Sequence, residues 1–116
     1  MRKSEKEPGV SKRKMEVRSK LEIGSYVIVR TYSAGVFAGT LRNESGRKVT
    51  LTEARRIWYW SGAASLSQLA QEGTKDPLNC KFPCPVDEVK LYETIEMLAV
   101  TPEARKSIES VPEWRA

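Results

Sequence analysis

The fold class is decided by Tyr26-Val-Ile-Val-Arg-Thr-Tyr32 and, after the turn Ser33-Ala34-Gly35, by Val36-Phe-Ala-Gly-Thr-Leu-Arg42. Both runs are rich in β-branched and aromatic residues, which fit a pleated, half-buried surface. Gly35 can adopt a positive φ in the turn, so the two runs are predicted to form a β-hairpin. Gly39, in the middle of the second run, predicts a bulge or a strongly bent strand.

Two further strands are predicted directly after this hairpin. A second turn, Asn43-Glu-Ser-Gly46, precedes a third strand over Lys48-Val-Thr-Leu-Thr52. Glu53-Ala54 interrupts the pattern before a fourth strand over Arg55-Arg-Ile-Trp-Tyr-Trp60. Short strands with tight turns and a bent glycine position predict an α+β fold built on a small, curled antiparallel sheet, an SH3-like or Sm-like half-barrel.

The next segment changes to a helical pattern. Ser65 and Gln68 have the spacing of a capping box, in which Ser65 is the N-cap and Gln68 reaches back to it. A short helix is therefore predicted over 66–72, with Gly73 placed for a C-terminal cap.

The remainder of the chain predicts a loop, one or two more strands and a last helix. Three prolines keep residues 73–86 from regular structure. Apolar residues between Val89 and Val100 indicate the strands. Thr101-Pro102-Glu103 is a strong helix start, and this helix is predicted to end near Ser110.

Charge divides the chain of 116 residues into a basic arm and a neutral body. Residues 1–20 carry eight Lys or Arg against three Glu, whereas residues 21–116 carry twelve of each sign. The arm is too poor in apolar residues to form a core, so a solvated, disordered arm is expected, with binding to nucleic acid as the alternative. Residues 21–116 are predicted to be a single domain. No apolar run approaches the ~18 residues of a membrane span, so a soluble, intracellular protein is expected.

The residue types present exclude much catalytic chemistry. The chain has no histidine, which removes triads and metal sites that depend on His. Its two cysteines, Cys80 and Cys84, cannot complete a four-ligand zinc site within one chain. We therefore expect no catalytic residues, no metal site and no cofactor, and leave open whether either cysteine has a role.

The candidate ligand site lies between Arg55 and Ser65. On a strand, Arg56, Trp58 and Trp60 share one face, while Arg55, Ile57 and Tyr59 share the other, with Ile57 and Tyr59 as the core face. Indole rings stack on nucleobases, arginines bind phosphate, and the small-residue turn at the helix start offers free N–H groups. The predicted ligand is nucleotide-like, and the predicted site residues are Arg55, Arg56, Trp58, Trp60, Ser61, Gly62 and Ser65.

An alternative assigns the two tryptophans to the core or to a subunit interface. One chain offers two short helices to cover its aromatic residues and strand edges. The sequence therefore also predicts a homo-oligomer with two-fold elements, in which the strand of Trp58 and Trp60 lies near the subunit boundary.

Four stretches of the sequence resemble a known family. They are Tyr26–Leu41, Ala54–Ala70, Cys80-Lys-Phe-Pro-Cys84 and Lys106–Trp114. Together they resemble a family of small tailed-phage proteins without an established activity. The resemblance covers roughly residues 22–114. It implies a viral origin and action in the cytoplasm of an infected bacterium.

In that setting the leading expectation is a non-enzymatic anti-defence protein that sequesters a nucleotide-like immune signal, of the cyclic nucleotide or ADP-ribose type. The first alternative is a nucleic-acid-binding module that uses the basic arm. The second is an inhibitor or adaptor that binds a host protein through exposed aromatic residues.

Overall fold

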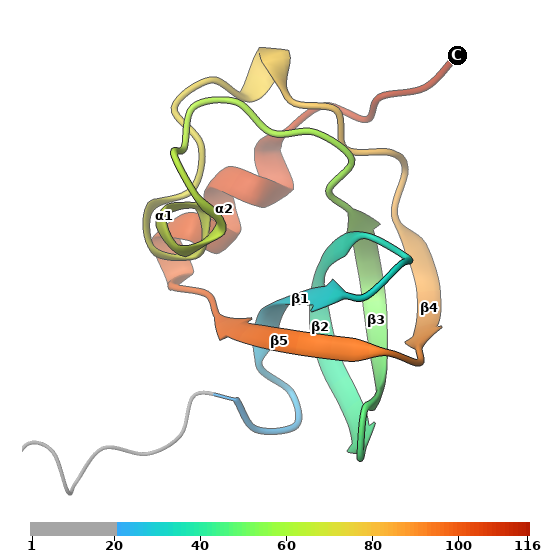
Figure 1. Ribbon diagram of the computed structural model, residues 1–116. Helices are drawn as coiled ribbons and strands as arrows, with labels where there is room; N and C mark the ends of the chain where they lie inside the picture. Colours follow the sequence, from blue (N-terminus) through green and yellow to red (C-terminus); the bar gives the residue numbers. More distant parts are fainter. Residues whose placement is uncertain (1–20) are drawn as a thin grey trace, which may run out of the picture.

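A computed structural model describes residues 21–116 of the chain, and the predicted basic arm lies outside these residues. A five-stranded antiparallel sheet and two helices make up the described fold (Figure 1). The elements are β1 (Tyr26–Thr31), β2 (Val36–Ser45), β3 (Lys48–Arg56), α1 (Leu66–Glu72), a 3₁₀ turn (Pro77–Asn79), β4 (Val86–Leu91), β5 (Thr94–Ala99) and α2 (Pro102–Ser110).

The sheet is strongly curled, because its two edge strands are consecutive in the chain. Its strand order is β4-β3-β2-β1-β5, so β4 and β5 lie at opposite edges, although only Tyr92 and Glu93 separate them. The edges of a flat five-stranded sheet are about 19 Å apart. The link from Leu91 to Thr94 spans at most about 11 Å. The sheet therefore bends until β5 crosses in front of the other strands, without closing (Figure 1). This confirms the predicted α+β class with a curled antiparallel sheet.

Two irregularities in the pairing of β2 with β3 help to produce the bend. The register shifts between Ala38 and Thr40, which confirms the irregularity predicted at Gly39, and again between Leu41 and Asn43. A Cβ on Gly39 would lie 3.1 Å from both the Ala54 Cα and the Thr52 carbonyl oxygen, so the two backbones approach closely here. On β3, Glu53 has a φ of 50°, a left-handed conformation that is uncommon for a residue other than glycine.

Two of the strand boundaries predicted from sequence are wrong. Glu53-Ala54 does not separate two strands, because β3 continues through the irregularity from Lys48 to Arg56 and then ends. The predicted turn Asn43-Glu-Ser-Gly46 is largely strand, since β2 extends to Ser45 and the chain reverses at Gly46 and Arg47. In both cases, pairing of adjacent residues with a neighbouring strand keeps residues of low strand propensity within the sheet.

Both helices begin and end where the sequence predicts. The Ser65 side chain accepts a hydrogen bond from the Gln68 N–H, and Gly73 closes α1 with a φ of 78°. The Gln68 side chain reaches back to the N–H of Ala64 rather than to that of Ser65, which differs from the predicted capping box. At α2, the Thr101 hydroxyl accepts from the Ala104 N–H and also donates to the Gln71 carbonyl oxygen at the end of α1.

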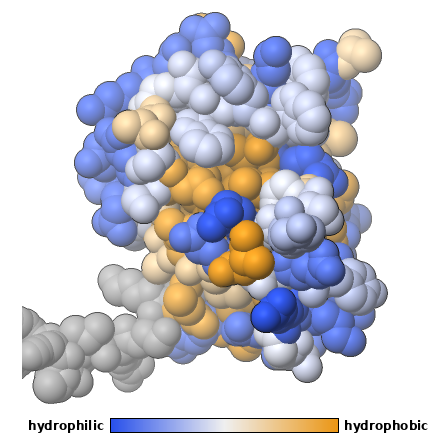
Figure 2. Space-filling model, in the orientation of Figure 1, coloured by the Kyte–Doolittle hydropathy of each residue, from blue (hydrophilic) through white to orange (hydrophobic). Residues whose placement is uncertain are grey.

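The core is divided between the two faces of the sheet. One cluster, around Ile28, Leu69, Phe82 and Ile108, joins the sheet to the helices. A second cluster fills the inside of the curl. Figure 2 shows an apolar area where β1 and β5 lie beside α1, surrounded by polar side chains. No helix in the described part of the chain is long and apolar enough to cross a membrane.

Candidate functional site

After β3 ends, three extended segments lie side by side and form a small second layer. Tyr59 pairs with Lys81 in an antiparallel bridge, and Phe82 pairs with Glu113 in a parallel bridge. The Trp58 N–H donates to the Lys81 carbonyl oxygen at 3.1 Å, and the Trp114 N–H donates to the Phe82 carbonyl oxygen at 2.9 Å. Because the segment of Lys81 and Phe82 bonds to both of the others, Trp58 and Trp114 come close together although they are more than 50 positions apart in sequence.

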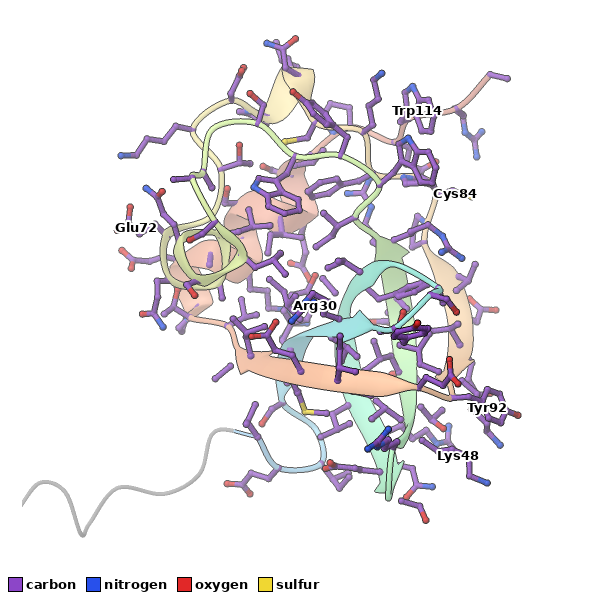
Figure 3. The ribbon with its side chains drawn as sticks, in the orientation of Figure 1. Arg30, Lys48, Glu72, Cys84, Tyr92 and Trp114 are labelled. Carbon is purple, nitrogen blue, oxygen red and sulfur yellow. The ribbon has the colours of Figure 1, made fainter. Side chains whose placement is uncertain are left out.

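The outer side of this layer carries an exposed group of side chains that we name the aromatic platform: Trp58, Tyr59, Lys81 and Trp114. The two indole rings are stacked, with centroids 6.4 Å apart and planes 10° from parallel. Trp58 is 64% exposed and Trp114 is 46% exposed. The Lys81 ammonium lies 5.6 Å from the Trp114 ring centroid and 5.9 Å from that of Tyr59. Trp114 lies at the opposite end of the molecule from Tyr92 (Figure 3).

Arg55 holds the platform from beneath. Its side chain is buried and donates to five backbone carbonyl oxygens: Phe82, Pro83, Ile108, Val111 and Pro112. The shortest bonds are to Val111 at 2.7 Å and to Phe82 at 2.9 Å. The guanidinium also lies 5.4 Å from the Phe82 ring centroid. Arg55 thus ties β3 both to the segment of Lys81 and to the segment of Trp114.

The local electrostatics suit a cation at this position. Ile108 and Val111 belong to the C-terminal end of α2, where the unpaired carbonyl groups and the helix dipole favour positive charge. Burial lowers the pKa of the Arg55 guanidinium, and the nearby Glu113 carboxylate opposes this shift. An arginine nevertheless stays charged at neutral pH.

The structure does not bring the seven predicted site residues together around one ligand space. Arg55 points into the fold, which agrees with its predicted place on the same strand face as Ile57. Its N–H groups donate to backbone carbonyl oxygens. Arg56 is exposed, lies 4.4 Å from the Phe37 ring centroid and donates to the Ala34 carbonyl oxygen. Trp60 packs against the helix-side core, and its indole N–H donates to the Ala63 carbonyl oxygen at 3.1 Å.

Strand alternation ends soon after β3 does. Ile57 is buried and Trp58 exposed, as the pattern predicts. Tyr59 is 50% exposed instead of lying in the core, so that part of the prediction is wrong. The chain turns at this point to pair with Lys81, which brings Tyr59 to the surface and Trp60 against the core.

The turn that leads into α1 uses its polar groups within the fold. The Ser61 N–H donates to the Cys80 sulfur, and its hydroxyl donates to an Asp76 carboxylate oxygen at 3.0 Å. Gly62 has a φ of 84°, and a Cβ on it would lie 2.5 Å from the Asp76 nitrogen. Ser65 caps α1. Ser61, Gly62 and Ser65 therefore shape the turn, and their role toward a ligand stays a prediction.

Two members of the platform were missed from sequence. Lys81 falls in the predicted loop over residues 73–86, and Trp114 lies beyond the last predicted helix. The sequence predicts that Trp58 and Trp60 share the face opposite the core, and nothing in the local pattern links Trp58 to Lys81 or Trp114. Cys80 is buried and Cys84 exposed, both as free thiols. Within residues 21–116, no three His, Cys, Asp or Glu side chains are grouped so that they could hold a metal ion.

Comparison with known proteins identifies the family of this chain. A family model described as a domain of unknown function, DUF6948, matches residues 24–108, so the chain belongs to that family. The match includes Trp58, Tyr59 and Lys81, and ends before Trp114. Neither the curated proteins nor the solved structures contain a significant match to the chain.

Proposed function

We propose that this chain is a non-enzymatic binding protein that recognises nucleotide bases by stacking them on the aromatic platform. The observation that carries the proposal is the exposed, stacked pair of Trp58 and Trp114 with the Lys81 ammonium beside it. Every nucleobase has a π-face that can stack on an indole ring, and an adjacent ammonium can contact the phosphate.

The open shape of the platform favours a single-stranded nucleic acid over a free nucleotide. Pockets for small ligands bury about 70–90% of the ligand surface. The platform instead presents its rings at the surface, with the Trp58 side chain mostly exposed. Successive bases of a strand can stack on such a surface, while the basic residues of positions 1–20 add electrostatic attraction to phosphates.

The resemblance to tailed-phage proteins supports the biological setting that we propose. In this setting the protein is viral and acts in the cytoplasm of an infected bacterium. Sequestration of a cyclic nucleotide or an ADP-ribose derivative is the small-ligand form of the same stacking chemistry. We also propose a homo-oligomer, because an open sheet leaves β4 and β5 as edge strands that a second copy can cover.

The test is a titration of a fluorescently labelled oligothymidylate, followed by anisotropy, with unlabelled cyclic dinucleotides and ADP-ribose as competitors. Loss of one stacking ring costs about 1–3 kcal/mol, so Trp58→Ala and Trp114→Ala should each weaken binding by about 5- to 150-fold. Tyr92→Ala is the matched control, since Tyr92 is 63% exposed and has the Lys48 ammonium 6.0 Å from its ring centroid.

Each outcome of this titration has a definite meaning. Binding that is lost in both tryptophan variants and kept in Tyr92→Ala supports the platform. Efficient competition by a small nucleotide would assign the site to that ligand, and weak competition would assign it to the strand. If the oligothymidylate and the nucleotides all fail to bind, the proposed function is wrong, and the exposed rings are better explained as an interface for a host protein.

A further inference from the structure

The described residues also form a concave site that borders Arg55, and none of the four platform residues lines it. It is a cleft of about 380 Å³ between the bulge of β3, the start of β4 and the end of α2. Four carboxylates line it: Glu53, Asp87, Glu109 and Glu113. The cleft also borders Arg55, whose donors are engaged by five carbonyl oxygens.

Two of these carboxylates are available to a ligand. Glu109 pairs with Arg105 at 3.0 Å, and Glu113 pairs with Arg115 at 3.2 Å. Within residues 21–116, Glu53 and Asp87 form no ion pair. Both are exposed and on adjacent strands, with Glu53 held at the β3 bulge.

The Tyr26 side chain is a second and independent sign of a ligand at this cleft. Tyr26 lines the cleft and is only 8% exposed. Among the described residues its hydroxyl has no hydrogen-bond partner and is not enclosed by protein atoms, so it is open to the cleft. Burial and the nearby Glu109 raise the pKa of Tyr26 to about 12, so the phenol is neutral at physiological pH. Its oxygen can accept a hydrogen bond from a molecule in the cleft.

The apolar residues of the cleft and the arrangement of its carboxylates indicate the chemical type of that molecule. Pro85, Val86 and Val111 give the cleft apolar surface beside its carboxylates. The four acids include no group of three that could share a metal ion. The site therefore offers contacts to a methylene chain as well as to a positive charge, which is the chemistry of an alkylamine and not that of a compact inorganic cation.

We propose that this cleft binds a primary alkylammonium group. The ammonium is held by the Glu53 and Asp87 carboxylates and donates to the Tyr26 phenol oxygen. The methylene chain packs on Val86 and Val111. A primary alkylammonium group occurs both in a free linear diamine and in the lysine side chain of a protein. The two ligands differ because the lysine side chain is attached to a peptide backbone.

Calorimetric titration of the full chain with 1,5-diaminopentane and with Nα-acetyl-lysine-N-methylamide tests this site. Loss of a charge-assisted hydrogen bond should weaken binding by about tenfold or more in Asp87→Asn and in Tyr26→Phe. Glu88→Gln is the matched control. It removes a carboxylate from the next position of β4, which alternates to the opposite face of the strand, and should change affinity by less than about twofold.

Binding of the diamine alone would identify a free alkylamine as the ligand, and binding of the lysine derivative would identify a protein side chain. The proposal is overturned if neither probe binds up to roughly 10 mM, where even weak ligands are detected. It is also overturned if Glu88→Gln weakens binding as much as Asp87→Asn, because the attraction would then be a diffuse effect of net charge. Oligothymidylate binding should be unchanged in Asp87→Asn, so the two sites can fail separately.

Discussion

Replacing Arg55 should destabilise the fold more than replacing any exposed charged residue, because five carbonyl oxygens from two distant segments converge on its guanidinium. Hydrogen bonds to a charged group contribute about 1.5–3 kcal/mol each. Two of the five bonds are short, at 2.7 and 2.9 Å, and the other three are 3.3 Å long. The short pair alone predicts about 3–6 kcal/mol, from which the desolvation of the charge removes part. We expect Arg55→Met to lose about 3–5 kcal/mol of unfolding free energy.

Guanidinium chloride unfolding, followed by tryptophan fluorescence, measures this loss. Arg55→Lys keeps the charge but offers three donors from one point, so it should lose about 1–3 kcal/mol. Arg56→Met is the control, because the neighbouring Arg56 is exposed and donates to the single carbonyl oxygen of Ala34; it should lose less than about 1 kcal/mol. If Arg55→Met is as stable as Arg56→Met, Arg55 does not tie the segments of the platform to β3.

Three further predictions concern the helices and the cleft. Thr101→Ala should lose about 1–2 kcal/mol of unfolding free energy, measured by thermal or chemical unfolding, because the N-cap of α2 and the hydrogen bond to Gln71 disappear together. Thr101→Ser keeps the hydroxyl, so its unfolding free energy should stay close to that of the native protein. Gly73→Ala should lose about 2–4 kcal/mol, since the φ is 78° and the new Cβ would lie 2.3 Å from the Ser107 Cβ; a loss below about 1 kcal/mol would contradict this packing. The pKa of Tyr26 is raised from 10.0 to about 12, so the folded state keeps a proton that the unfolded state releases. Stability is therefore intact below pH 10 and falls by roughly 2–3 kcal/mol as the pH rises to 12, a loss that Tyr26→Phe should lack when both are unfolded in urea across this range.

The fold could be predicted where the pattern is local. The strand Tyr26–Thr31 was predicted from its own β-branched and aromatic residues, and the two helix starts from the capping residues Ser65 and Thr101, and the structure confirms all three. The continuity of β3 through Glu53 could not be predicted in this way, because pairing with β2 and β4 holds a backbone conformation that the residue itself disfavours.

The candidate site was predicted in part. Trp58 is exposed as predicted, whereas Tyr59 is exposed instead of buried and Trp60 packs against the core. The stacking partner Trp114 and the neighbouring Lys81 arrive from segments that are distant in sequence, and local reasoning cannot place them. Arg55 shows the same limit. The sequence predicts a phosphate as the partner of Arg55 or Arg56, whereas the Arg55 guanidinium donates to backbone carbonyl oxygens, among them two at the end of α2.

The central claim is that bases stack on Trp58 and Trp114, and the indole N–H signals of the chain test it most directly. The sequence contains three tryptophans, so a ¹⁵N–¹H correlation spectrum of the full chain should show three indole signals, assigned with single Trp→Phe variants. Trp60 is an internal control, because its indole N–H is bonded to the Ala63 carbonyl oxygen and the ring packs against the core. On titration with oligothymidylate, the account predicts that the Trp58 and Trp114 signals shift together while the Trp60 signal stays in place. Binding that leaves both platform signals unmoved, or that shifts Trp60 as much as the other two, would contradict it.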